Sequence, residues 1–283
     1  VSDKLKGKIF VVTGVFEIYS RDDLKKAIEN KVEILQGAVE NIEFYDEIFS
    51  VETKNKKTYQ SKIVIGAFGK RSNLDIQLKR QFITSKSPYL AVKTHVKGHF
   101  PEDLVALHNF EGGYCGVSKI ENDHINLCYI TNYKQFKKYK NIEEFEEKVL
   151  FKNHFLKNIF SQTTPVFEKP LTISQISFEE KKPIENHIIM CGDTAALIHP
   201  LCGNGMSMAF KSAQLASTLI IKFFNKEIKD RAALEKQYLR DWNTTFKLRL
   251  KTGRIVASLF NKPMLSEVLM RGLKWVPNVL PLI

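Results

Sequence analysis

The sequence lacks several features that would place it in a specialised class. Its 283 residues contain no apolar run approaching the roughly 18 residues that span a bilayer, and no apolar stretch with a cleavage-like site lies at the start. The four cysteines form no Cys-x-x-Cys pair and have no histidine at metal-ligand spacing, so neither a zinc site nor a disulfide framework is indicated. We therefore expect a cytoplasmic protein with reduced thiols and no bound metal.

Acidic residues are fewer than basic residues. There are 31 acidic residues against 43 lysines and arginines, which gives a formal net charge of +12. A basic surface attracts nucleic acids and anionic membranes, but the lysines are scattered in short groups beside acidic residues or turns, as on a solvated face. We expect no nucleic-acid partner. The apolar and basic stretch at 267–283 could contact a membrane surface. Pro277 and Pro281 favour instead a segment that docks on the protein or belongs to a truncated C-terminal tail, because they interrupt any long helix.

What is present is the pattern of a mixed α/β protein with one large domain or two smaller ones. We expect helices at 21–30, 142–160, 204–224 and 231–260. Buried strands are expected at 32–35, 63–69 and 187–193, and a hairpin around the polar turn at 54–57. Longer antiparallel strands are expected between 88 and 131, followed by a strand at 171–178. The prediction is an α/β layer at each end and an antiparallel sheet between them.

One stretch, CGDTAALIHPLCGNGMSMAFKSA at residues 191–213, combines a buried strand end, an aspartate, a loop with two glycines and a helix of small residues. Such an order presents backbone N–H groups and the positive end of a helix dipole to one small volume, which suits an anion or a polarised carbonyl. Gly203 and Gly205 would let the backbone approach a ligand, and Asp193 could accept hydrogen bonds from a ligand hydroxyl. Taken alone, the pattern equally fits a helix that begins with a glycine-containing turn.

This stretch resembles the second flavin motif of the FAD-dependent family that contains the aromatic-ring hydroxylases, such as p-hydroxybenzoate hydroxylase, and the geranylgeranyl reductases. In that family the aspartate holds the ribityl chain of FAD, and the backbone at the helix start faces the flavin ring. The resemblance implies a cofactor-binding set of Asp193, Pro200, Gly203, Asn204, Gly205 and Met206. The helix dipole there would stabilise negative charge on the reduced flavin.

Three further stretches support the resemblance. KIVIGAFGKRSNLD at 62–75 is similar to the family's V-I-G-A-D-G-x-x-S turn, although Phe68 stands where the family has Asp, which puts a role in nicotinamide handling in doubt. Arg21 takes the place of an arginine that opens a helix near the flavin. The segment at 111–130 resembles a hairpin of the reductases' substrate sheet.

The Gly-x-Gly-x-x-Gly run that cradles the FAD pyrophosphate in this family is absent from the 283 residues. The resemblance therefore implies that an N-terminal segment or a partner chain completes the FAD site, and that the chain alone holds FAD poorly. It implies a partial Rossmann-like FAD-binding domain at 1–80, an antiparallel-sheet substrate domain at 81–180, a return to the FAD-binding domain at 181–225, and C-terminal helices at 226–283.

The function that the resemblance implies is that of an FAD-dependent oxidoreductase, a reductase or monooxygenase, which acts on an apolar organic substrate with NAD(P)H as electron donor. No catalytic acid or base can be named, because such a residue must first be placed within hydrogen-bond reach of the substrate. The alternative is a truncated or degenerate relative that binds no flavin and acts as a scaffold or interaction module.

Overall fold

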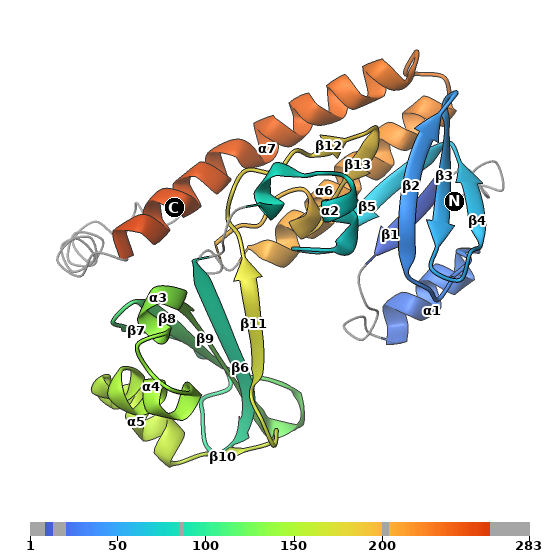
Figure 1. Ribbon diagram of the computed structural model, residues 1–283. Coiled ribbons are helices and arrows are strands. Elements are labelled where there is room, and N and C mark those ends of the chain that lie inside the picture. The colour runs from blue at the N-terminus through green and yellow to red at the C-terminus, as the bar shows by residue number, and fades with distance from the viewer. Residues whose placement is uncertain (1–8, 14–20, 85–87, 200–203, 261–283) are drawn as a thin grey trace. The chain divides into compact units, whose positions relative to one another are not determined.

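The computed structural model describes residues 9–13, 21–84, 88–199 and 204–260, which form two compact units (Figure 1). The first unit combines the described residues up to Thr84 with those from Phe178 to Ala257. The second unit is built mainly from the described residues between these two segments. The chain thus leaves the first unit after Thr84 and returns to it at Phe178.

A four-stranded sheet lies at the centre of the first unit. Its order is β1 (Ile9–Thr13), β5 (Ile63–Ala67), β13 (Ile188–Met190) and β12 (Ile184–Glu185), of which the first three are parallel and the last is antiparallel. β5 and β13 consist mostly of buried apolar residues, as expected for parallel strands covered on both faces. Both strands lie within the segments predicted from the sequence.

Two long helices, α6 (Gly205–Phe224) and α7 (Arg231–Phe260), share one hydrophobic core with this sheet. In α7 every fourth residue from Leu234 to Leu250 is buried, so a single stripe of the helix faces the core. On that stripe the hydroxyl of Tyr238 donates a hydrogen bond to the carbonyl oxygen of Met190 at 2.7 Å, which ties α7 to the end of β13. The two C-terminal helices predicted from the sequence are confirmed.

A three-stranded antiparallel meander follows α1 (Arg21–Glu29) and consists of β2 (Val39–Tyr45), β3 (Ile48–Thr53) and β4 (Thr58–Ser61). The connection from β3 to β4 is the hairpin predicted around 54–57. The strand predicted at 32–35 is wrong: the segment forms a turn and coil in which Val32 and Leu35 stay exposed. A short apolar run does not form a strand when it has no partner strand and is not buried from solvent.

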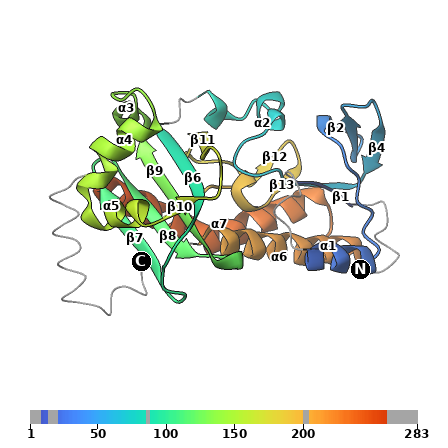
Figure 2. The same cartoon turned by 90° about the horizontal axis from the view of Figure 1, so that it is seen from below.

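The second unit is an antiparallel sheet, which confirms the predicted fold class with its inserted sheet. The order is β10 (Thr164–Pro165), β6 (Tyr89–Lys97), β9 (His124–Asn132), β8 (Gly113–Lys119) and β7 (Val105–Phe110), with β11 (Leu171–Ile176) also paired to β6 (Figure 2). One face of the sheet packs against α4 (Ile142–Lys148) and α5 (His154–Ser161) around the buried side chains of Tyr129, Phe145 and Leu156.

The single helix predicted at 142–160 is interrupted. A 3-10 turn, η5 (Leu150–Lys152), separates α4 from α5, and the side-chain oxygen of Asn153 accepts hydrogen bonds from the N–H groups of Phe155 and Leu156. This N-cap starts a new helix, because it satisfies N–H groups that have no partner in the first turn. The remaining short elements are α2 (Asn73–Gln77), α3 (Tyr133–Phe136), η3 (Gln81–Ile83), η4 (Glu121–Asp123) and η6 (Gly192–Thr194).

Two negative findings apply to the described part of the chain. No helix in it is long and apolar enough to cross a membrane. Its histidine, cysteine and acidic residues form no group that could hold a metal ion.

Candidate functional site

The strand-loop-helix motif is built around a close approach between η6 and α6. Gly192 adopts a φ of +58°, and a Cβ atom placed on it would lie 3.2 Å from the Cβ atom of Ala209 in α6. The N–H of Gly192 donates to the Ser212 hydroxyl oxygen at 2.9 Å. Both the backbone conformation and the close packing therefore require glycine at this position. Since Gly192 contacts α6, Asp193, the next residue, lies beside the first turns of that helix.

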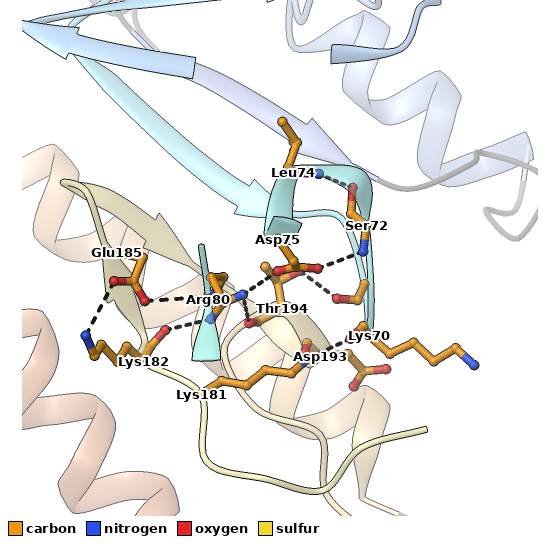
Figure 3. Close-up of polar contacts among 11 residues, drawn as sticks. Lys70, Ser72, Leu74, Asp75, Arg80, Lys181, Lys182, Glu185, Asp193 and Thr194 are labelled. Carbon is orange, nitrogen blue, oxygen red and sulfur yellow. Dashed lines mark hydrogen bonds and ion pairs between the residues drawn. The ribbon is translucent and has the colours of Figure 1, made fainter. Parts of the chain in front are cut away.

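Asp193 lies in η6, directly after β13, among cationic side chains (Figure 3). The ammonium group of Lys181 donates to the carbonyl oxygens of Asp193 and Lys70, both at 2.7 Å. Burial raises the pKa of the Asp193 carboxyl, while the charges of Lys181 and Lys70 act in the opposite direction. Burial also lowers the pKa of Lys181 to about 8, with a further contribution from Arg80. Lys181 thus joins the loop after β5 to the loop after β13.

A buried ion pair supports the same two loops. Arg80 Nη1 lies 2.8 Å from Asp75 Oδ1 and also donates to the Thr194 carbonyl oxygen at 2.9 Å, while Nη2 donates to the Lys182 carbonyl oxygen at 3.0 Å. The other oxygen of Asp75 accepts the N–H of Ser72 at 2.7 Å, which completes a capping box at the start of α2. The position of the Asp193 loop is therefore fixed from β5 as well as from α6.

No described residue caps or covers the start of α6. Asn204 is its N-cap residue, but its side chain makes no capping hydrogen bond. A Cβ atom on Gly205, the first helical residue, would have nothing within 4 Å, and the Met206 side chain is 79% exposed. Within the described residues this 20-residue helix has no side-chain cap, and an uncapped helix start presents N–H groups and a positive partial charge to a ligand.

A cavity of about 1080 Å³ lies along β1, from Phe10 to its carboxyl end, and beside the loop that follows β5. Ligands of open α/β sheets bind at this edge. Its described lining includes three cations, Lys57, Lys70 and Arg71, and no acidic residue. The apolar part of the lining comes from β1, β4 and the segments around 34–39 and 68–74: Phe10, Val12, Ile34, Leu35, Val39, Tyr59, Phe68 and Leu74.

The residues predicted from the sequence are placed as follows. Asp193 lies in η6, which packs against α6. The start of α6 is formed by Asn204, Gly205 and Met206. Arg21 is the first residue of α1, and its side chain, together with Pro200 and Gly203, lies outside the described residues. Their roles toward a cofactor stay predictions.

Sequence reasoning missed the residues that hold the loops together. Asp75, Arg80 and Lys181 are buried, although they are charged. The only signal in the sequence was Ser72-x-x-Asp75, a capping-box spacing three residues after Gly69. Nothing in the sequence pattern shows that Arg80 and Lys181, about a hundred residues apart, reach the same loop.

Comparison with known proteins agrees with the motif. Residues 141–262 match the model of the squalene epoxidase family. Conditioned medium factor receptor 1 of Dictyostelium discoideum is 25% identical over 206 residues, which are 70% of this chain and 39% of that protein. A stretch of 30 residues, 11% of the chain, is 83% identical to part of the DNA ligase of Flavobacterium psychrophilum, of which it covers 4%.

Solved flavoproteins share the fold. HpxO of Klebsiella pneumoniae, in complex with FAD and uric acid, superposes with a TM-score of 0.64 at 14% identity, over 90% of this chain and 67% of that one. The halogenase PltM, in complex with phloroglucinol and FAD, gives a TM-score of 0.64 at 17% identity, over 86% of this chain and 53% of that one. The chain therefore has the fold of the FAD-dependent halogenases and hydroxylases related to p-hydroxybenzoate hydroxylase. It resembles this family as its flavin motif predicted, and it spans only part of the length of its relatives.

Proposed function

We propose that this chain forms the flavin-facing part of an FAD-dependent oxidoreductase. The observation that carries the proposal is the open N-terminus of α6 packed beside the Asp193 loop, in a fold shared with FAD-bound hydroxylases and halogenases. An isolated helix start is common, but here a half-buried aspartate and a glycine with positive φ are held against it.

The residues present fit FAD. Asp193 would accept hydrogen bonds from the ribityl hydroxyls, and the free N–H groups after Asn204 would face the N1–C2=O edge of the ring. When bound, the flavin would supply hydride acceptance and either substrate reduction or oxygen activation. The protein's part is to position the ring and to stabilise the negative charge of its reduced form by the helix dipole.

The substrate class and electron donor are further parts of the proposal. A small organic substrate agrees with similar proteins whose structures hold phloroglucinol or uric acid together with FAD, and an apolar one is proposed from the resemblance alone. NAD(P)H is proposed as the donor. Phe68, which stands where the family has aspartate, is buried in the core and offers no carboxylate at that turn, so any nicotinamide contact would have to come from other residues.

Titration of the purified chain with FAD, followed by flavin fluorescence, tests the proposal. We expect weak but saturable binding, in keeping with the expectation that the chain alone holds FAD poorly. Asp193→Asn should weaken it by about a further tenfold or more, because a hydrogen bond to a charged group contributes about 1.5–3 kcal/mol. Asp103→Asn, an exposed aspartate in the second unit, is the matched control and should bind as wild type. Binding that is absent, or equal in all three proteins, would contradict the proposal and favour the flavin-free scaffold.

A further inference from the structure

We infer that β7 is a dimerisation edge, at which the β7 strands of two copies of this chain pair antiparallel about a two-fold axis at Leu107. The contact involves the second unit alone, and the flavin plays no part in it.

β7 is the outermost strand of its sheet and has none of the features that protect sheet edges. Within the described residues it pairs with β8 and with no other strand (Figure 2). Its six residues include no proline and no acidic, lysine or arginine side chain, and its register with β8 is free of bulges. At the opposite edge of the sheet, β10 contains Pro165, and β11 has a bulge between Ser174 and Ile176. Charges, prolines and bulges are the features by which proteins block unwanted strand pairing, so β7 is the edge of this sheet that can accept another strand.

The outward backbone groups of β7 are available for such pairing. The side-chain amide of Asn153 donates to the Asn109 carbonyl oxygen at 3.0 Å, so the backbone groups of Asn109 point away from β8. Because this direction alternates along an antiparallel strand, the groups of Val105 and Leu107 point the same way. No hydrogen bond from another described residue reaches those two residues on this side. Pairing about Leu107 would set Val105 opposite Asn109 of the second copy, whose carbonyl oxygen has a second lone pair to offer.

Leu104 and a hollow at the other end of β7 fit each other across the two-fold axis. The hollow has a volume of about 380 Å³ and is lined by Phe110 of β7 and Phe155 of α5, among others. With Leu107 at the axis, Leu104 lies opposite Phe110 of the second copy, and opposite residues point to the same face of a sheet. The Leu104 side chain, which is 44% exposed, would therefore enter the hollow beside Phe110. A two-fold contact is made twice, so both hollows are filled.

The charges at the ends of β7 allow this arrangement. Across the axis Asp103 lies opposite Glu111 of the second copy, and the ammonium group of Lys152, 3.9 Å from the Glu111 carboxylate, supplies a cation beside both.

Association through β7 stops at the dimer. Each β7 edge is used once, and Pro165 and the bulge in β11 block the opposite edge, so the joined sheets do not grow into a fibre. The contact consists of one strand pair and two leucine side chains. Such a small interface predicts a weak dimer that forms as the protein concentration rises.

Sedimentation equilibrium of the full chain over a range of concentrations tests the inference. We expect a reversible equilibrium between monomer and dimer. Leu107→Lys places two ammonium groups face to face at the axis and should raise the dimer Kd by about tenfold or more. Leu104→Ser should also raise it, because the hollow stays empty. Leu171→Lys makes the same change at an exposed leucine of β11 and should leave the Kd unchanged.

The urea midpoint of each variant, measured at a concentration at which wild type is monomeric, should equal that of wild type, since Leu104, Leu107 and Leu171 are all exposed. Equal midpoints assign a change in Kd to the contact itself rather than to folding.

Leu107→Cys tests the register of the two strands. Residues paired at the axis of an antiparallel ladder have Cα atoms about 5.5 Å apart, which a disulfide can bridge. Under copper phenanthroline oxidation, Leu107→Cys should give more disulfide-linked dimer than wild type with its four native cysteines, and Leu171→Cys should not. A protein that stays monomeric up to its solubility limit, a dimer that Leu107→Lys leaves unchanged, or equal cross-linking at the two positions would overturn the inference.

Discussion

The guanidinium group of Arg80 and the carboxylate of Asp75 lie 2.8 Å apart, and each side chain is only 1% exposed. Arg80 also donates to backbone oxygens of Lys182 and Thr194, on either side of β12 and β13 (Figure 3). One side chain thus links the loop after β5 to the backbone before β12 and after β13. Since Thr194 adjoins Asp193, the ion pair supports the candidate flavin site indirectly, through the backbone.

Removing one partner of this pair should destabilise the protein strongly. In Asp75→Ala the Arg80 guanidinium stays buried without its counter-charge, and the expected loss is about 3–5 kcal/mol of unfolding free energy. Urea denaturation followed by circular dichroism measures it. The surface pair of Lys56 with Glu40 is the control: Glu40→Ala should cost less than about 1 kcal/mol, because both groups are well exposed. Equal losses in the two variants would show that the Asp75–Arg80 contact does not hold the loops.

Two glycines of the flavin motif should respond in opposite ways to alanine. Gly192→Ala places a Cβ atom on a residue with a φ of +58° and against Ala209, so we expect a loss of about 1–3 kcal/mol. Gly205→Ala meets no atom within 4 Å at the first position of α6, and we expect unchanged or slightly higher stability. Thermal unfolding of both variants distinguishes them. If Gly205→Ala proved the more damaging, the α6 start would not be open as described.

The sequence predicted the elements of this fold better than it predicted their connections. Parallel strands such as β5 could be identified because continuous apolar runs are typical of buried strands, and α7 because its core residues recur every four positions. The break between α4 and α5 was missed because the apolar stripe continues through it, and only the capping side chain of Asn153 marks the new start.

The candidate site was predictable where backbone conformation restricts the residue type, and not elsewhere. Asp193 was predicted because a strand-terminal aspartate before a glycine-containing loop is a recognisable pattern, whereas the positive φ of Gly192 is seen only in the structure. Lys70 and Lys181 leave no such pattern, since a lysine looks the same in a sequence whether it is solvated or buried. Their burial results from tertiary contacts between segments more than a hundred residues apart, which no local periodicity encodes.

Because of Lys181, the free energy of unfolding should increase with pH in the alkaline range. Its pKa is lowered from 10.5 to about 8 by burial, so between about pH 8 and pH 10.5 the unfolded chain binds a proton that the native protein does not. Stability therefore gains a contribution as pH rises through this window. Lys181→Met should lack that rise in urea midpoints measured from pH 7.5 to 10.5. Lys182→Met is the adjacent control, because the Lys182 side chain is largely exposed. Parallel curves for wild type and Lys181→Met would contradict the assignment.

Glu146 should produce the opposite slope in the second unit. The hydroxyl of Tyr129 donates to Glu146 Oε1 at 3.1 Å, a bond that favours the charged form, but burial dominates and raises the pKa of Glu146 from 4.5 to about 7. Between these two pH values the native protein keeps a proton that the unfolded chain has released. The contribution of Glu146 to stability is therefore fully present below about pH 4.5 and is lost as pH rises toward 7.

Glu146→Gln isolates this effect. Glutamine keeps an oxygen that can accept the Tyr129 hydroxyl, but it cannot ionise, so the variant should gain stability relative to wild type as pH rises from 4.5 to 7 and differ little below that range. Urea unfolding followed by circular dichroism across this range measures the difference. Glu147→Gln is the matched control. The Glu147 carboxylate is exposed, so this variant should have the same pH dependence of stability as wild type. A difference in unfolding free energy between wild type and Glu146→Gln that stays constant with pH would mean that Glu146 is solvated. The core of the second unit around Tyr129 and Phe145 would then be more open than described, because burial among these side chains is what keeps the carboxyl protonated near neutral pH.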